Sequence, residues 1–99
     1  MAHIILRPRA ERDIREIWLY LAEQTDANHA DRVAHQMLQK LEMAATHPYI
    51  GRQRTEIRSD LRSLVIGRYL AFYFPLDDGI DLVRVIYGGR DLSQALAEE

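Results

Sequence analysis

Arginines around the closing strand are the residues of this chain best suited to contact a partner. Arg84 stands between apolar neighbours, and Arg90 and Asp91 follow the pair Gly88-Gly89. A guanidinium group pairs with carboxylates in a bidentate fork and stacks on aromatic rings. We expect the two glycines to let the chain leave the strand at unusual dihedral angles, which places Arg90 and Asp91 at the sheet edge. Two interpretations stay open for this pair: a contact with a target, or a local ion pair that closes the strand.

Arg84 and the tyrosines of the preceding strand also have structural interpretations. A mid-strand Arg84 pairs with an acidic residue such as Asp13 or Glu42, or it faces a partner. Tyr69 and Tyr73 share a strand face at spacing i, i+4, and we expect core packing for at least one of them.

The remaining polar residues exclude several classes of site. The chain has no cysteine, so it has no disulfide framework or thiol nucleophile, which fits a reducing, cytoplasmic location. Its four histidines lack the spacing of a metal site, and we predict no metal and no cofactor. The net charge of −2 lacks the basic excess of a polyphosphate-binding protein, so we expect no direct nucleic-acid binding. Five arginines between Arg52 and Arg68 form a solvated loop or a docking patch.

Length and composition indicate one globular domain over residues 1–99. A chain of 99 residues with 47% hydrophobic residues can bury one core. No apolar run approaches the roughly 20 residues that span a bilayer, so we expect no membrane segment. The N-terminus lacks the basic and apolar regions of a signal peptide, so we expect none.

Two helical patterns come first. Pro8 opens the first helix, because its missing N–H costs nothing at the first helical position. Trp18 and Tyr20 fall on or beside its apolar stripe, and we expect both rings to pack between helix and sheet. Thr25-Asp26 ends this helix and caps the next, which carries a second stripe and stops at His47-Pro48. Two stripes joined by so short a connection predict an antiparallel helical hairpin.

Short strands surround this hairpin. Residues 4–6 predict an N-terminal strand, and residues 61–66, 69–74 and 80–87 predict a three-stranded antiparallel meander. The last strand alternates between two largely apolar faces, one with Leu82, Arg84 and Ile86 and the other with Val83, Val85 and Tyr87. We predict an α+β fold in which the hairpin covers one sheet face and the N-terminal strand lies beside the last strand. The other face predicts an exposed apolar patch beside Leu82 and Ile86, which a partner would cover.

Four groups of residues follow one another in a specific order: Leu6-x-Pro8-x-Ala10-x-x-Asp13-Ile14-x-x-Ile17-Trp18-x-Tyr20; Ala44-x-x-x-Pro48-x-x-Gly51; Leu61-Arg62 with Gly67-x-Tyr69-Leu70-x-x-Tyr73; and Arg84-Val85-Ile86-Tyr87-Gly88-Gly89-Arg90-Asp91. In this order and spacing they resemble the RelE/ParE toxin superfamily, and its ParE branch in particular. The resemblance covers nearly the whole chain.

The resemblance implies the toxin of a type II toxin–antitoxin system. ParE-like members poison DNA gyrase by binding, and a ribbon-helix-helix, ParD-like antitoxin neutralises them with a tail that folds onto the toxin. RelE-like members are ribosome-dependent mRNA endoribonucleases. We predict the gyrase inhibitor. The alternatives are the endoribonuclease and a non-toxic interaction or co-repressor module.

The nuclease alternative depends on particular residues. Those nucleases carry an arginine where this chain has Tyr69 and a tyrosine where it has Leu96. Arg90 matches their second arginine, and Lys40 is the one lysine available in place of the several they carry. Attack by a 2′-hydroxyl needs a group that removes its proton and cations that stabilise the transition state. We therefore assign no catalytic residue and favour a binding function over an enzyme.

We predict two groups of contact residues. Those expected to bind the target are Arg90, Asp91, Tyr87 and Tyr69. Those expected to bind the antitoxin are Leu82, Arg84, Ile86, Arg62 and Tyr73.

Overall fold

The computed structural model describes residues 2–90 and 92–97, and its elements follow the predicted order. Strand β1 (His3–Leu6) precedes two helices, α1 (Pro8–Gln24) and α2 (Ala27–Thr46). The elements that follow are β2 (Arg52–Gln53), β3 (Arg62–Ile66), β4 (Tyr69–Leu76), β5 (Gly79–Tyr87) and α3 (Leu92–Ala97). The short strand β2 and the helix α3 are additions to the predicted set.

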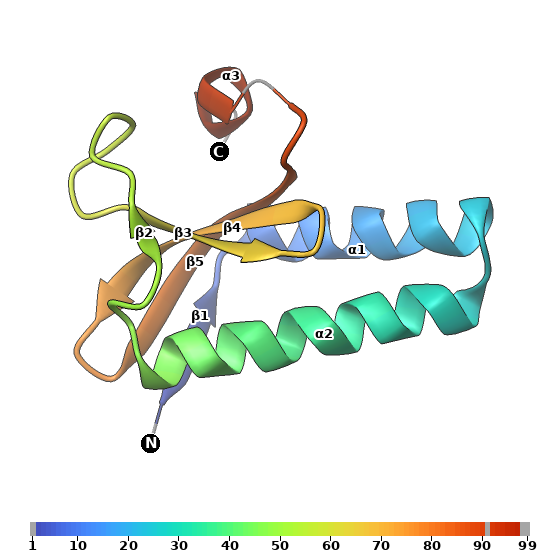
Figure 1. The fold of residues 1–99 in the computed structure, drawn as a ribbon, viewed down its shortest axis with the longest axis horizontal. Coiled ribbons are helices and arrows are strands. Elements are labelled where there is room, and N and C mark those ends of the chain that lie inside the picture. The colour runs from blue at the N-terminus through green and yellow to red at the C-terminus, as the bar shows by residue number, and fades with distance from the viewer. Residues whose placement is uncertain (1, 91, 98–99) are drawn as a thin grey trace.

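Local interactions fix the two helices as an antiparallel hairpin, which confirms the prediction. Pro8 occupies the first turn of α1. The Asp26 side chain accepts a hydrogen bond from the His29 N–H at 2.8 Å, which caps α2. Further along, the Trp18 indole N–H donates to Asp31 Oδ1 at 2.8 Å and ties the helices together. The end of the hairpin where α1 meets α2 projects beyond the sheet (Figure 1).

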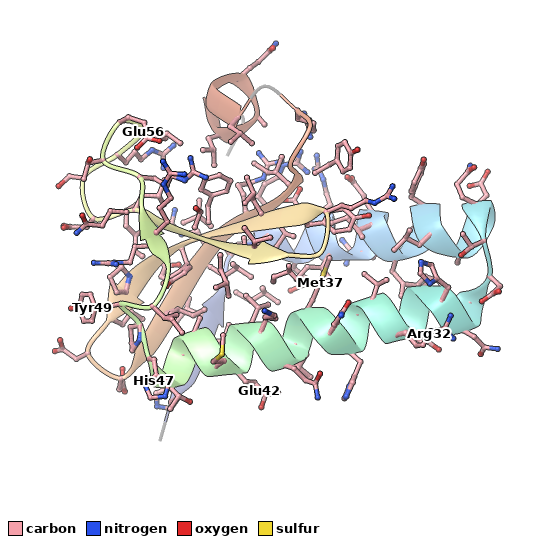
Figure 2. The ribbon with its side chains drawn as sticks, viewed as in Figure 1. Arg32, Met37, Glu42, His47, Tyr49 and Glu56 are labelled. Carbon is pink, nitrogen blue, oxygen red and sulfur yellow. The ribbon has the colours of Figure 1, made fainter. Side chains whose placement is uncertain are left out.

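The sheet has five strands in the order β1-β5-β4-β3-β2. Strand β1 runs parallel to β5, and the other neighbours are antiparallel. The predicted position of the N-terminal strand beside the last strand is thus confirmed. The hairpin packs on one face, where Met37 of α2 is buried against the sheet and Glu42 points away from it (Figure 2).

A β-bulge in β5 breaks the alternation that the sequence predicts. The pairing of β4 with β5 shifts register at Val83, the extra residue on β5. One extra residue moves those that follow it to the opposite face. Leu82 and Val85 therefore pack under the hairpin, whereas Val83 and Ile86 lie on the second face. The prediction that Leu82, Arg84 and Ile86 share one face is wrong for this reason.

The second face is covered by α3 and by the segment between β2 and β3, as Figure 1 shows for α3. The buried residues of this second core are Leu61, Phe72, Val83, Ile86, Ala95 and Leu96. Leu82 and Ile86 are 0% and 1% exposed, so the predicted apolar patch beside them is wrong. Helix α3 has six residues, too few turns to show a periodic pattern in the sequence.

Candidate binding site

An open cleft of about 860 Å³ separates the projecting end of the hairpin from the tip of the sheet. The helices contribute Tyr20, Leu21 and His29 to it, and the sheet side contributes Arg68 and Tyr69. This volume lies in the range of ligand and peptide sites. Tyr87 and Arg90 line the same cleft. The structure therefore brings together Tyr69, Tyr87 and Arg90, three of the four residues expected to bind a target. The fourth, Asp91, lies outside the described residues.

Turn geometry and strand register place the aromatic rings of this cleft. Gly67 has φ +59°, in the left-handed region that favours glycine, and it begins the turn between β3 and β4. Arg68 follows at the tip of the turn, and Tyr69 then pairs with Tyr87 across the strands. The Tyr69 and Tyr87 rings meet edge to face, with centroids 6.1 Å apart and planes at 71°. They form a corner with two aromatic walls.

The segment after β5 brings Arg90 back to this corner. The Gly88 N–H donates to the Arg68 carbonyl at 2.9 Å, and the Arg90 N–H donates to the Tyr87 carbonyl at 3.1 Å. The expectation of unusual dihedral angles at Gly88 and Gly89 is wrong, because neither has a positive φ. Glycine is needed for space instead: a Cβ on Gly89 would lie 2.6 Å from the Tyr87 ring.

Burial and three neighbouring side chains of the cleft shift the pKa of Tyr69. Burial raises the pKa of Tyr69 above its ordinary value, the neighbouring Tyr20 raises it further, and Arg68 lowers it. The nearby Tyr87 adds a further increase to the pKa of Tyr69. Tyr69 is therefore a neutral phenol at physiological pH. Tyr20 is 61% exposed at the cleft, so the prediction that its ring packs between helix and sheet is wrong.

Asp13 lies at the base of the cleft and is held by Arg84. The Arg84 Nε and Nη2 atoms donate to the Asp13 carboxylate at 2.6 and 3.1 Å, and Nη1 donates to the Ala95 carbonyl in α3. The Val85 N–H also donates to Asp13, at 3.1 Å. The predicted Arg84–Asp13 pair is confirmed. Since Arg84 is 0% exposed, it ties α1, β5 and α3 together and offers no surface for the antitoxin contact predicted for it.

The other residues expected to bind an antitoxin lie away from the cleft. Leu82, Ile86 and Tyr73 are buried in the two cores. The Tyr73 hydroxyl accepts from the Gly51 N–H and donates to the Pro48 carbonyl, both at 2.9 Å, and burial raises the pKa of Tyr73. These contacts hold the segment after α2 against β4, and they give Tyr73 a structural role.

Arg62 fixes the same segment. Its guanidinium donates to the carbonyls of Tyr49 and Gly51 at 2.9 and 2.8 Å and lies 5.1 Å from the centroid of the Tyr49 ring. Arg54 donates to Ser63, and Arg58 donates to the Leu96 carbonyl of α3. Three of the five arginines from Arg52 to Arg68 therefore stabilise the fold through hydrogen bonds. This stretch is not simply a docking patch.

The cleft residues that the sequence interpretation missed are Tyr20, Arg68 and His29. Tyr20 sits one position before Leu21 on the helical stripe, and Arg68 sits one position before Tyr69 in a turn. Only the approach of the β3–β4 turn to the hairpin brings them together, and this contact has no local signal in the sequence. The positions compared with the nuclease branch are dispersed: Tyr69 and Arg90 line the cleft, whereas Leu96 is buried under the other sheet face.

Within residues 2–90 and 92–97, no group of three or more His, Cys, Asp or Glu side chains is arranged to hold a metal ion. No helix in this described part of the chain is long and apolar enough to cross a membrane.

Comparison with known proteins gives consistent matches. The family model described as the ParE toxin of the type II toxin–antitoxin system parDE matches residues 4–92. Toxin ParE1 of Mycobacterium tuberculosis strain CDC 1551/Oshkosh is 31% identical over 93 residues, which cover 93% of this chain and 95% of that protein. Toxin ParE1 of strain ATCC 25618/H37Rv matches with the same values.

A solved structure supports the fold independently of sequence. A chain from the chromosomal ParDE toxin–antitoxin system of P. aeruginosa matches with a TM-score of 0.74. The match covers 88% of this chain and 96% of that chain at 13% sequence identity. The likeness therefore rests on the arrangement of the elements, and it confirms the predicted fold.

Proposed function

The chain belongs to the ParE toxin family of type II toxin–antitoxin systems, and on that premise we propose that it arrests growth by binding DNA gyrase. A ribbon-helix-helix, ParD-like antitoxin neutralises it in a hetero-oligomeric complex, and both act in the cytoplasm. The observation that carries the proposal is the cleft, where Tyr69, Tyr87 and Arg90 line one open surface. Tyrosine and arginine, together with tryptophan, are the side chains enriched at binding hot spots.

The arrangement of the cleft supports inhibition by binding over catalysis. Ribonucleolytic cleavage needs a proton acceptor and several cations around one phosphate. Tyr69 occupies the position of one nuclease arginine and carries no positive charge, and Leu96 lies in the opposite core. The cleft instead combines aromatic surface with Arg68 and Arg90, which suits a protein contact.

The test is a supercoiling assay with purified gyrase, relaxed plasmid and ATP. Wild-type toxin is expected to reduce supercoiling or trap cleaved DNA in a dose-dependent way, and adding the co-expressed antitoxin is expected to restore supercoiling. A reconstituted translation reaction run in parallel is expected to leave ribosome-bound mRNA intact. Cleavage of that mRNA in phase with codons, with normal supercoiling, would replace this proposal with the endoribonuclease. Absence of both effects together with normal growth on expression would favour the non-toxic co-repressor module.

A further inference from the structure

Strand β1 is an edge strand of the sheet, and its outer side is open. The strand order places β1 beside β5 alone, and the part of the chain that the structure describes holds no other segment paired with β1. Ile5 is 53% exposed and Leu6 is 39% exposed at this edge. Lysine and proline commonly protect an edge from further pairing, and β1 contains neither. The edge is therefore able to accept a further strand.

The backbone of β1 turns alternate residues toward the open side. The N–H groups of His3 and Arg7 donate to main-chain carbonyls within residues 78–82, at 2.8 and 3.2 Å. Successive residues of a strand direct their N–H and C=O groups to opposite edges. Ile4 and Leu6 therefore point these groups away from β5, and they are the residues that offer donors and acceptors to another strand.

These outward groups match a second copy of the same edge. Ile4 and Leu6 flank Ile5 on either side. When two β1 strands meet antiparallel about Ile5, Ile4 of each copy lies opposite Leu6 of the other, and the two residues exchange both main-chain hydrogen bonds. Every outward group of the two edges then finds a partner. The two Ile5 side chains meet as a non-hydrogen-bonded pair, the arrangement in which opposite side chains come closest.

The charges at the two ends of this edge are also self-complementary. At one end His3 lies 3.4 Å from Asp78, and both side chains are exposed. At the other end Arg7 donates to the Asp81 carboxylate at 2.8 Å. In the antiparallel pairing, the end of one copy that carries the Asp78 carboxylate meets the end of the other that carries the Arg7 guanidinium, so opposite charges meet at both ends. A foreign strand would have to supply this charge pattern and the apolar centre together, whereas a second copy supplies both by symmetry.

We propose that β1 is a self-association surface, on which a second copy of this chain docks by antiparallel pairing about Ile5. The two sheets then form one continuous sheet across the dimer. An edge of this length buries little area, so the dimer is weak and depends on concentration. The inference goes beyond the proposed function and is independent of it, because no residue of β1 lines the cleft.

Sedimentation equilibrium of the untagged 99-residue chain, between about 10 μM and about 1 mM, tests the dimer. The mean mass of the wild type is expected to rise with concentration from that of one chain toward that of two. Ile5→Lys places two like charges opposite each other, so it is expected to stay a monomer over the whole range. Val65→Lys is the matched control, because Val65 is 62% exposed on β3, away from β1, and this variant is expected to associate like the wild type. Melting temperatures within about 4 °C of wild type confirm that both variants are folded.

A single cysteine tests the register of the pairing. The chain has no cysteine, so Ile5→Cys introduces one thiol per copy. A non-hydrogen-bonded antiparallel pair has Cα atoms about 4.5 Å apart, a separation that a disulfide spans. Mild oxidation is therefore expected to link Ile5→Cys into a covalent dimer at least about tenfold faster than it links Val65→Cys, because the dimer raises the local thiol concentration only at Ile5.

Several results would overturn the inference. A wild type that stays monomeric up to the highest concentration removes the dimer. A dimer that persists in Ile5→Lys, or that Val65→Lys abolishes, places the interface on another surface. Equal rates of oxidation in the two cysteine variants exclude the pairing about Ile5. A monomeric wild type whose co-purification with the antitoxin is lost in Ile5→Lys assigns the edge to the antitoxin. None of these measurements uses gyrase, so the proposed function stands or fails separately.

Discussion

Removing Arg84 tests whether one buried ion pair holds the two layers of the fold together. Arg84 is fully buried, and its guanidinium donates to the Asp13 carboxylate and to the Ala95 carbonyl. In Arg84→Ala, both acceptors lose their hydrogen bonds from Arg84 in a buried region. Leaving one partner of a buried pair uncompensated costs about 3–5 kcal/mol.

The remaining contacts of Asp13 set the expected loss within that range. Asp13 keeps the Val85 N–H at 3.1 Å and the Arg9 guanidinium at 3.3 Å, so the carboxylate is not left alone. We therefore expect a loss of about 3 kcal/mol, at the lower end of the range. A domain of this size loses about 4–8 °C in melting temperature per kcal/mol, so the expected fall is about 12–24 °C.

Thermal and urea unfolding of Arg84→Ala, Asp13→Asn and the double variant measure the coupling directly. The Asn amide oxygen still accepts from Val85, so the double variant isolates the ion pair. We expect the two losses not to add, with a coupling of about 0.5–3 kcal/mol, as for residues in contact. Strict additivity, or an Arg84→Ala variant as stable as an exposed arginine variant, would refute the assignment of Arg84 as the tie between layers.

Three further changes have distinct expected outcomes. Arg90→Ala should abolish growth inhibition and keep antitoxin binding while changing stability by less than about 1 kcal/mol, as measured by a growth assay, co-purification and melting. Gly79→Ala should displace β1 and lower the melting temperature strongly, because its Cβ would lie 1.9 Å from the His3 carbonyl oxygen. Gly67→Ala places its Cβ in open space and should cost only the strain of the left-handed conformation, about 1–2 kcal/mol. Equal losses of stability in the two variants would contradict this reasoning. Asp26→Ala should cost about 1 kcal/mol in urea unfolding through the lost cap of α2, and no change would argue against the cap.

The elements with strong local signals could be predicted from the sequence. Pro8 and Asp26 mark the starts of the two helices, and the apolar stripes give the hairpin its inward face. Alternating strands and the turns between them give the meander. The Arg84–Asp13 pair could also be predicted, because a buried arginine needs an acidic partner.

Features that depend on distant contacts could not be predicted. The bulge at Val83 lies in the pairing of β5 with β4, and no local pattern in the sequence indicates it. The bulge places Ile86 on the face that α3 covers, so the predicted apolar patch is buried. The cleft depends on the approach of Tyr69 in the sheet to Tyr20 in the hairpin, and these two segments carry no shared sequence signal.

The parallel pairing of β1 with β5 has a consequence for how the chain folds during translation. The Arg7–Asp81 and Arg84–Asp13 contacts join residues 74 and 71 positions apart. Contacts of such sequence separation close long loops, so their formation is entropically costly and slow. The hairpin can form on the emerging chain, but the edge strand and the buried ion pair must wait for β5. Tyr87 and Arg90 leave the ribosome later still, so a nascent chain acquires the cleft only after β5 and the residues that follow it have emerged.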